Sequence, residues 1–165
     1  MFPFGRDLLA IYLQDHLAAA TTGVQLARRA RGSNEGTAYA DFLARLEREI
    51  AEDREALREL MGRLEIGADR LKIAAGWTAE KAGRLKLNGR LTGYSPLSRV
   101  VELEALMAGV TSKLAGWRAL RRLAERDERL DPVELDRLIA RAERQLSSLA
   151  EQHRSAAGEA LVAGS

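Results

Sequence analysis

The sequence predicts an all-α protein, an up-down four-helix bundle with an additional, shorter crossover helix. Three observations lead to this fold class. Ala, Leu, Arg, Glu and Lys make up more than half of the 165 residues, while there are only three prolines, a composition typical of long helices. Apolar residues recur at helical spacing in four long stretches, and turn-like sequences separate these stretches. A chain of this length is expected to form one domain, residues 1–165.

The first half of the chain contains three expected helices. The first covers residues 6–31, because the turn-like sequence GSNEG follows at residues 32–36. The second covers residues 37–65, with Gly67 at the position beyond the C-terminus that favours glycine. The third, over residues 69–87, is shorter and ends at the Asn-Gly pair of residues 88 and 89. We expect it to cross over along the outside of the bundle.

Two further helices follow a loop. Ser95 as N-cap and Pro96 in the first turn predict a fourth helix over residues 95–126. Asp131 and Pro132 open a fifth helix over residues 131–157, with Glu134 placed to complete a capping box. Each of the four long helices would span about 37–46 Å at 1.5 Å per residue, which suits near-antiparallel packing.

Ligand-type side chains at the centres of the apolar stripes carry the functional hypotheses, because burying such groups is costly unless they are paired. Each long helix has one: His16, Asp53, Glu104 and His153. Counted along the helices, His16 and Asp53 share one level, while Glu104 and His153 share another about 15 Å away. The register therefore predicts two His–carboxylate pairs rather than one site with four ligands.

Several interpretations of these four residues remain open. The pairs could be buried and hydrogen-bonded, or the four residues could face a partly wet rim near the end of the bundle. Alternatively, Glu49 or Glu52 could join His16 and Asp53 in a metal-binding or redox site with an atypical ligand set.

A basic cluster around the start of the fourth helix suggests a weaker alternative, an anion-binding module. Arg84, Lys86, Arg90 and Arg99 lie near Ser95 in sequence, and a helix N-terminus offers free N–H groups and a positive dipole to a phosphate or carboxylate. The competing interpretation is a solvated loop in which Ser95 and Pro96 only start a helix.

The order of the helices resembles the ferritin-like superfamily: two antiparallel helices, a crossover and two more antiparallel helices. The stretch from His16 through the AEK sequence of residues 79–81 is similar to small stress-associated ferritin-like proteins of bacteria. Di-iron members of the superfamily supply a carboxylate from each of two helices and a Glu-x-x-His motif from each of the other two. This chain has no such motif, since Leu13 stands three residues before His16 and Ala150 three before His153. The resemblance thus implies the scaffold but not oxidase or iron-storage activity.

From these features we expect a non-catalytic ferritin-like bundle without a cofactor, acting as an interaction or structural module. Its expected partner is a second copy or another protein. Ile73 and Trp77 form a second apolar edge on the helix at 69–87, which either a second subunit or a neighbouring helix would cover.

Composition and charge narrow the remaining classes. The absence of cysteine excludes disulfides, thiolate metal sites and a cysteine nucleophile. The net charge is only +2, and acidic residues follow the arginine clusters, which argues against a nucleic-acid groove. No apolar run approaches the about 20 residues of a membrane-spanning helix. The start of the chain has no positive region ahead of an apolar stretch, so we expect a cytoplasmic protein.

Overall fold

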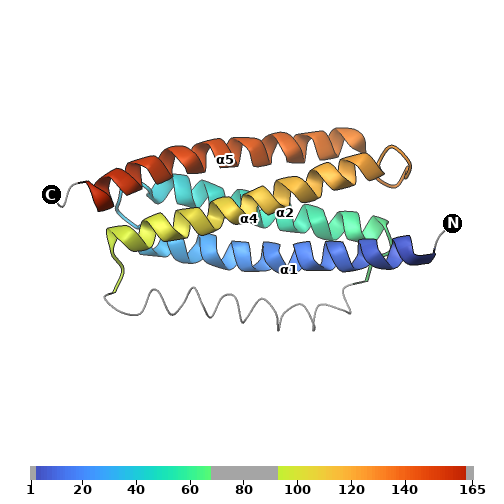
Figure 1. Ribbon diagram of the computed structural model, residues 1–165, viewed down its shortest axis with the longest axis horizontal. Helices are drawn as coiled ribbons and strands as arrows, with labels where there is room; N and C mark the ends of the chain where they lie inside the picture. Colours follow the sequence, from blue (N-terminus) through green and yellow to red (C-terminus); the bar gives the residue numbers. More distant parts are fainter. Residues whose placement is uncertain (1–2, 68–92, 163–165) are drawn as a thin grey trace.

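A computed structural model describes residues 3–67 and 93–162, and this part of the chain forms four long α-helices and no strands (Figure 1). The helices are α1 (Pro3–Ser33), α2 (Ala40–Arg63), α4 (Pro96–Leu123) and α5 (Pro132–Leu161). The predicted all-α bundle is confirmed at this level. The helix predicted over residues 69–87, with its apolar edge at Ile73 and Trp77, lies outside the described residues.

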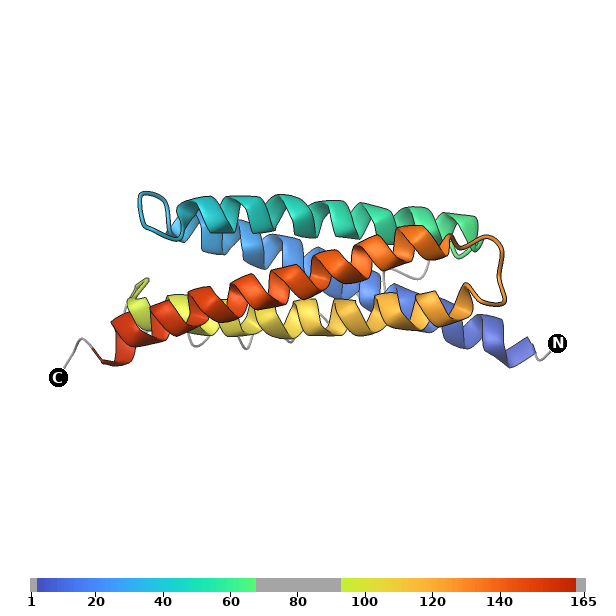
Figure 2. The ribbon, with the colours of Figure 1, turned by 90° about the horizontal axis from the view of Figure 1, so that it is seen from above.

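The four helices form two antiparallel hairpins that lie side by side (Figures 1 and 2). α1 packs against α2 and against α4, and α4 packs against α5. Near the start of α1, Gln14 Nε2 donates to the carbonyl of Gly67, just beyond the end of α2. At the opposite end of α1, Asn34 Nδ2 donates to the hydroxyl of Tyr94, just before α4. α2 and α4 therefore run in the same direction.

Both predicted N-caps are present. Ser95 Oγ accepts from the Ser98 backbone N–H while Ser98 Oγ accepts from the Ser95 N–H, which forms a reciprocal capping box. Asp131 accepts from the Val133 N–H. Glu134 does not complete a capping box as predicted. Its carboxylate instead accepts from Arg63 at 2.7 Å, because that guanidinium at the end of α2 offers a stronger, charged donor.

The end of α2 differs from the prediction. The helix stops at Arg63, and the residue in the left-handed region is Glu65, with φ of 57°, rather than Gly67. The N–H of Ile66 donates to the carbonyl of Met61, which closes the last turn, and the side chain of Ile66 is buried. Glu65 thus adopts a backbone conformation that glycine would adopt more readily. The hydrogen bond from Ile66 and the burial of the Ile66 side chain accompany this conformation.

The core follows the apolar stripes of the four helices. Leucines supply most of the fully buried large side chains: Leu13, Leu17, Leu43, Leu60, Leu64, Leu103, Leu120, Leu135 and Leu149. Burying one such side chain is worth about 1.5–3 kcal/mol, so this set is the main driving force for association of the helices. None of the described helices has the combination of length and hydropathy that a bilayer crossing requires.

Candidate binding site between α1 and α4

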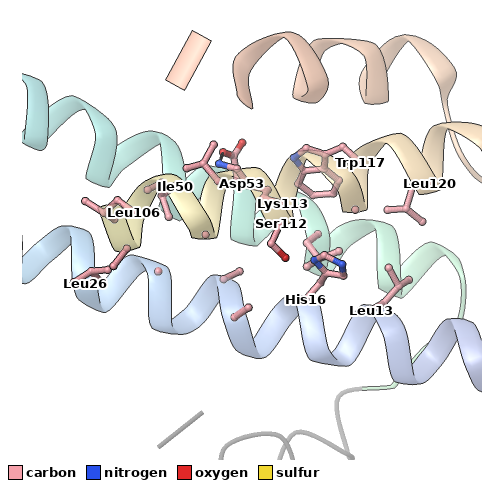
Figure 3. Close-up of a pocket in the computed structure, with 18 residues that line it drawn as sticks. Leu13, His16, Leu26, Ile50, Asp53, Leu106, Ser112, Lys113, Trp117 and Leu120 are labelled. Carbon is pink, nitrogen blue, oxygen red and sulfur yellow. Dashed lines mark hydrogen bonds and ion pairs between the residues drawn. The ribbon is translucent and has the colours of Figure 1, made fainter. Parts of the chain in front are cut away.

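A cavity of about 60 Å³ opens between α1 and α4, and side chains of α2 form its base (Figure 3). Small residues on the facing helices leave this space, because glycine and alanine cannot fill the gap between two helix backbones. They are Ala19, Ala20 and Gly23 on α1, and Ala105, Gly109 and Gly116 on α4. At its rim Gly109 and Ser112 are exposed, whereas Leu106 and Trp117 are buried. The cavity therefore leads from the surface into the core.

The walls of the cavity are mostly apolar. Leu13 of α1, Leu57 of α2 and Leu106 of α4 are buried and line it. A volume of this size holds a few water molecules or a short alkyl group. Polar groups enter at two places, where Asp53 and Lys113 lie on the α2 side and His16 lies on the α1 side (Figure 3).

Asp53 is the centre of a buried set of charges that joins three helices. Its side chain is 2 % exposed. Oδ2 accepts a short hydrogen bond from Lys113 Nζ of α4 and a second one, at 3.3 Å, from Gln145 Nε2 of α5. Oδ1 lies 2.5 Å from Nη2 of Arg141 but receives no aligned hydrogen bond from the described residues, so that contact is ionic in character. The carboxylate is thus neutralised by two cations from different helices.

Two acidic residues of α2 complete this group, which we call the Asp53 cluster: Asp53, Glu49, Glu52, Lys113, Arg141 and Gln145. Glu52 accepts from Arg141 at 2.8 Å, and Glu49 accepts from Gln145 at 3.0 Å. Gln145 Oε1 in turn accepts from Lys113 at 2.5 Å. Burial holds the pKa of Lys113 below its usual value, while the charge of Asp53 acts in the opposite direction. The cluster cross-links α2, α4 and α5 in the middle of the bundle.

The predicted His16–Asp53 pair does not form. Both residues line the cavity, but Asp53 uses its oxygens for Lys113 and Arg141. The prediction counted ligand-type residues along the stripes and left out the cations, which bind a buried carboxylate strongly. Within residues 3–67 and 93–162, no group of three or more His, Cys, Asp or Glu side chains is arranged to hold a metal ion. The described residues therefore do not support the alternative in which Glu49 or Glu52 joins His16 and Asp53 in a metal site.

His16 lies on the α1 wall of the cavity. Its ring packs edge to face with the ring of Tyr12, with centroids 4.5 Å apart, and it also lies against Gly116. A β-carbon at Gly116 would come within 3.0 Å of His16 Cε1, so the missing side chain makes room for the imidazole. Burial lowers the pKa of His16, and the nearby Asp15 partly offsets this effect. No hydrogen bond reaches its ring nitrogens from the residues that the structure describes.

Four residues of the site were not identified from the sequence: Lys113, Trp117, Arg141 and Gln145. Gln145 could have been found, since it lies in the apolar stripe of α5 between Ala142 and Leu149 and is 3 % exposed. Lys113 could not, because long cationic side chains at the edge of a stripe usually reach solvent. Trp117 is also buried, and its indole Nε1 has no hydrogen-bond partner among the residues that the structure describes.

The second predicted pair is present. His153 Nε2 lies 3.0 Å from Glu104 Oε1, with the two side chains 28 % and 57 % exposed. This pair is therefore at the surface rather than in the core. The buried carboxylate of α4 is Glu102, which accepts from Arg29 at 3.0 Å and from the hydroxyl of Tyr94 at 3.0 Å.

Of the five residues in the predicted anion site, the structure describes two. Arg84, Lys86 and Arg90 lie outside the described residues. The hydroxyl of Ser95 serves its own helix as a cap. Arg99 donates to Asn34 at 2.6 Å and to Glu159 at 3.0 Å, and its guanidinium lies over the ring of Tyr39, 4.4 Å from the centroid. The arginine nearest to the helix start is thus committed to partners within the bundle.

Arg99 belongs to a group at one end of the bundle, which we call the end cluster: Asn34, Tyr39, Tyr94, Arg99, Glu102 and Glu159. Tyr39 donates to Glu159 at 2.8 Å, and Tyr94 bridges Asn34 and Glu102. Burial raises the pKa of Tyr94 to about 12, assisted by Glu102 and opposed by the bond from Asn34. These contacts tie the end of α1 to the start of α4 and the end of α5.

Comparisons of this chain with family models, curated proteins and solved structures find no match.

Proposed function

We propose that this chain is a non-catalytic, ferritin-like bundle that binds a small apolar molecule in the cavity between α1 and α4. The single observation that carries the proposal is that cavity, which has apolar walls and opens to the surface at Gly109 and Ser112. The parallel course of α2 and α4 is the feature that favours a ferritin-like connection, because it places the end of one hairpin and the start of the next at opposite ends of the bundle.

The polar groups of the cavity favour binding over catalysis. Nucleophilic catalysis needs a nucleophile in hydrogen-bond contact with a base that a third group orients. Ser112 and His16 share the cavity (Figure 3), yet no hydrogen bond joins them among the described contacts, and no carboxylate hydrogen-bonds the imidazole. Lys113 is held by Asp53 and Gln145. What this geometry offers is an apolar space with fixed polar groups at its edge, which is typical of ligand sites.

Xenon tests the proposal, since it is a small apolar probe that enters apolar cavities. We expect xenon NMR to show saturable binding to the wild-type protein. Gly23→Leu should abolish this binding, because the new side chain starts at a cavity-lining position, where Ile50 is the one described residue within 4 Å of its β-carbon, at 3.8 Å. Gly62→Leu is the matched control, since Gly62 is exposed on α2 and has open space around it. Equal xenon binding by wild type and Gly23→Leu would contradict the proposal.

A further inference from the structure

Two side chains at the rim of the cavity carry polar atoms that lack a partner among the described residues and remain within reach of a ligand. Ser112 lines the cavity and is exposed, and its hydroxyl makes no hydrogen bond with the described residues. His16 lines the same cavity and is half-buried. Its ring nitrogens also receive no hydrogen bond from the described residues, yet neither is among the buried polar atoms of this part of the chain. A molecule in the cavity can therefore contact both side chains.

The surroundings of Gly116 place these two side chains near each other. A β-carbon at Gly116 would lie 3.0 Å from Cε1, 3.1 Å from Nδ1 and 3.3 Å from Nε2 of His16, so the ring edge with both nitrogens faces α4. Ser112 precedes Gly116 by four residues and therefore lies one turn away on the same face of α4. Figure 3 agrees with this placement, because the hydroxyl and the imidazole lie together between α1 and α4. A single small head group is enough to contact both.

The charged groups of the cavity offer no counter-ion to a ligand. Within the described lining, Asp53 and Lys113 are the charged side chains, and they pair with each other. Arg141, from outside the lining, neutralises the second oxygen of Asp53. Asp15, the exposed neighbour of His16, does not line the cavity. An ion that leaves water for such a site loses hydration that nothing there replaces, so the site favours an uncharged ligand.

We infer that the ligand of this cavity is a small uncharged amphiphile, whose head group hydrogen-bonds to His16 and Ser112 at the rim while its short alkyl tail lies among the apolar side chains. This inference rests on the proposed function. Burial holds the pKa of His16 below its usual value of 6.5, so the imidazole is neutral at pH 7.5 and offers one donor and one acceptor. A serine hydroxyl also donates and accepts. A primary amide matches this pair, because it accepts through its oxygen and donates through its nitrogen.

The enclosed part of the cavity limits the tail to a few carbon atoms. Its volume is about 60 Å³, and buried side chains of three helices, Leu13, Leu57 and Leu106, form apolar walls. Each methylene group that enters from water should strengthen binding about fourfold. A propyl group is therefore a suitable tail for a probe.

Three probes of the same shape test whether the ligand is uncharged. Butyramide, butyrate and butyramidinium have the same propyl tail and a planar head of similar size, and at pH 7.5 they are neutral, anionic and cationic. Nitrogen–proton correlation NMR of the full chain follows the imidazole of His16, whose signals a His153→Gln variant identifies. We expect butyramide to displace xenon from the cavity, to shift these imidazole signals and to bind at least about tenfold more tightly than either ion.

A variant at the rim tests the head-group contact separately from the apolar walls. Ser112→Ala removes one hydrogen bond to the head group, so butyramide should bind about fivefold more weakly while xenon binds as before. Because Ser112 is exposed and makes no hydrogen bond with the described residues, the alanine variant should fold normally. Ser147→Ala is the matched control, since Ser147 is an exposed helical serine of α5 outside the described cavity lining.

The outcomes separate this inference from the proposed function. An ion that binds as tightly as butyramide, imidazole signals that stay unchanged at saturating butyramide, or equal affinity of wild type and Ser112→Ala for butyramide would overturn the inference. If xenon still binds in a way that Gly23→Leu abolishes, the proposed function stands. If neither xenon nor butyramide binds, the proposed function and the inference both fail.

Discussion

Asp53 shows at the scale of one residue how the bundle accommodates a charge in its interior. A buried carboxylate is tolerated only when cations and hydrogen-bond donors replace water. Lys113 from α4 with Arg141 and Gln145 from α5 provide this replacement. Removing the carboxylate would therefore leave the cations of α4 and α5 without their shared partner.

We predict that Asp53→Leu lowers the free energy of unfolding by about 3–5 kcal/mol, since it leaves the buried ammonium of Lys113 without its counter-ion. The double variant Asp53→Leu/Lys113→Met should recover much of this loss, because it removes both charges and keeps the volume apolar. Urea denaturation followed by circular dichroism on the four members of the cycle measures the coupling. Additive losses in the double variant would show that the two residues do not depend on each other.

His16 makes a prediction about pH. Burial lowers its pKa below 6.5 in the folded protein, so between the folded-state pKa and 6.5 the unfolded chain binds more protons. Stability must then rise with pH through this window and fall on acidification below 6.5. We expect His16→Gln to lose less stability than wild type between pH 6.5 and pH 5. Urea denaturation of both proteins at several pH values between 6.5 and 5 measures this difference, and equal losses of stability would contradict the prediction.

At the same scale, the position of Asp53 in the apolar stripe of α2 correctly indicated that it could be buried, but the predicted partner, His16, was wrong. Helical periodicity tells which face of a helix a residue occupies, and this is enough to place Asp53 and Gln145 in stripes. It does not tell which residues of neighbouring helices meet that face. The contact with Lys113 depends on how α4 is rotated and shifted against α2, which only packing decides.

At the scale of one element, α4 carries two glycines in its interior with opposite surroundings. Gly109 has open space around it, whereas a β-carbon at Gly116 would lie 3.0–3.3 Å from three ring atoms of His16. Glycine inside a helix costs about 1 kcal/mol relative to alanine. The space that each position offers therefore decides whether an alanine there stabilises or destabilises the protein.

We predict that Gly109→Ala raises the free energy of unfolding by about 0.5–1 kcal/mol, the helix-propensity gain. Gly116→Ala should be neutral or destabilising, because the ring of His16 must move. In a His16→Ala background Gly116→Ala should show the full gain. Thermal unfolding of the wild type and these four variants tests this pattern. A gain at Gly116 that is the same with and without His16 would mean that the ring is not held against α4.

The element scale is also where sequence reasoning succeeded best. The starts of α4 and α5 were predicted at Ser95 and Asp131, because serine or aspartate followed by proline is a local signal for a helix start. The end of α2 was less accurate. Glycine was expected to occupy the left-handed position, but Glu65 occupies it, in a turn where the neighbouring Ile66 is buried in the core. Such tertiary burial is not encoded in the turn residues alone.

At the scale of the whole molecule, the two hairpins are joined at two levels. The Asp53 cluster joins α2 to α4 and α5 in the middle, and the end cluster joins α1, α4 and α5 at one end. The contact between Glu104 and His153 was predicted from the lengths and directions of the helices. These set how far along the bundle axis each residue lies, and they place the two residues at the same height. The cavity could not be predicted, because it depends on the distance between α1 and α4.

Arg99 is the residue through which the end cluster acts on the whole bundle. Its side chain is 13 % exposed. It contacts two parts of the chain that are distant from it in sequence: Asn34 and Tyr39 between α1 and α2, and Glu159 near the end of α5. We predict that Arg99→Leu lowers the free energy of unfolding by about 2–3 kcal/mol. The reason is that Asn34 is fully buried and its side-chain amide oxygen, Oδ1, loses the charged donor that Arg99 supplies. A loss of that size corresponds to a fall in Tm of about 4–12 °C for a chain of this length.

Arg118→Leu is the matched control for this prediction. Arg118 also pairs with a glutamate across α4 and α5, at 2.8 Å from Glu143, but the two side chains are 60 % and 50 % exposed. Exposed pairs of this kind contribute about 0–1 kcal/mol, so its Tm should change little. Arg99→Lys should recover only part of the loss. The guanidinium of Arg99 contacts Asn34 and Glu159 through two different nitrogens, whereas the ammonium of lysine has only one. Equal changes for Arg99→Leu and Arg118→Leu would mean that the end cluster does not hold the two hairpins together, and that the Asp53 cluster and the apolar core suffice.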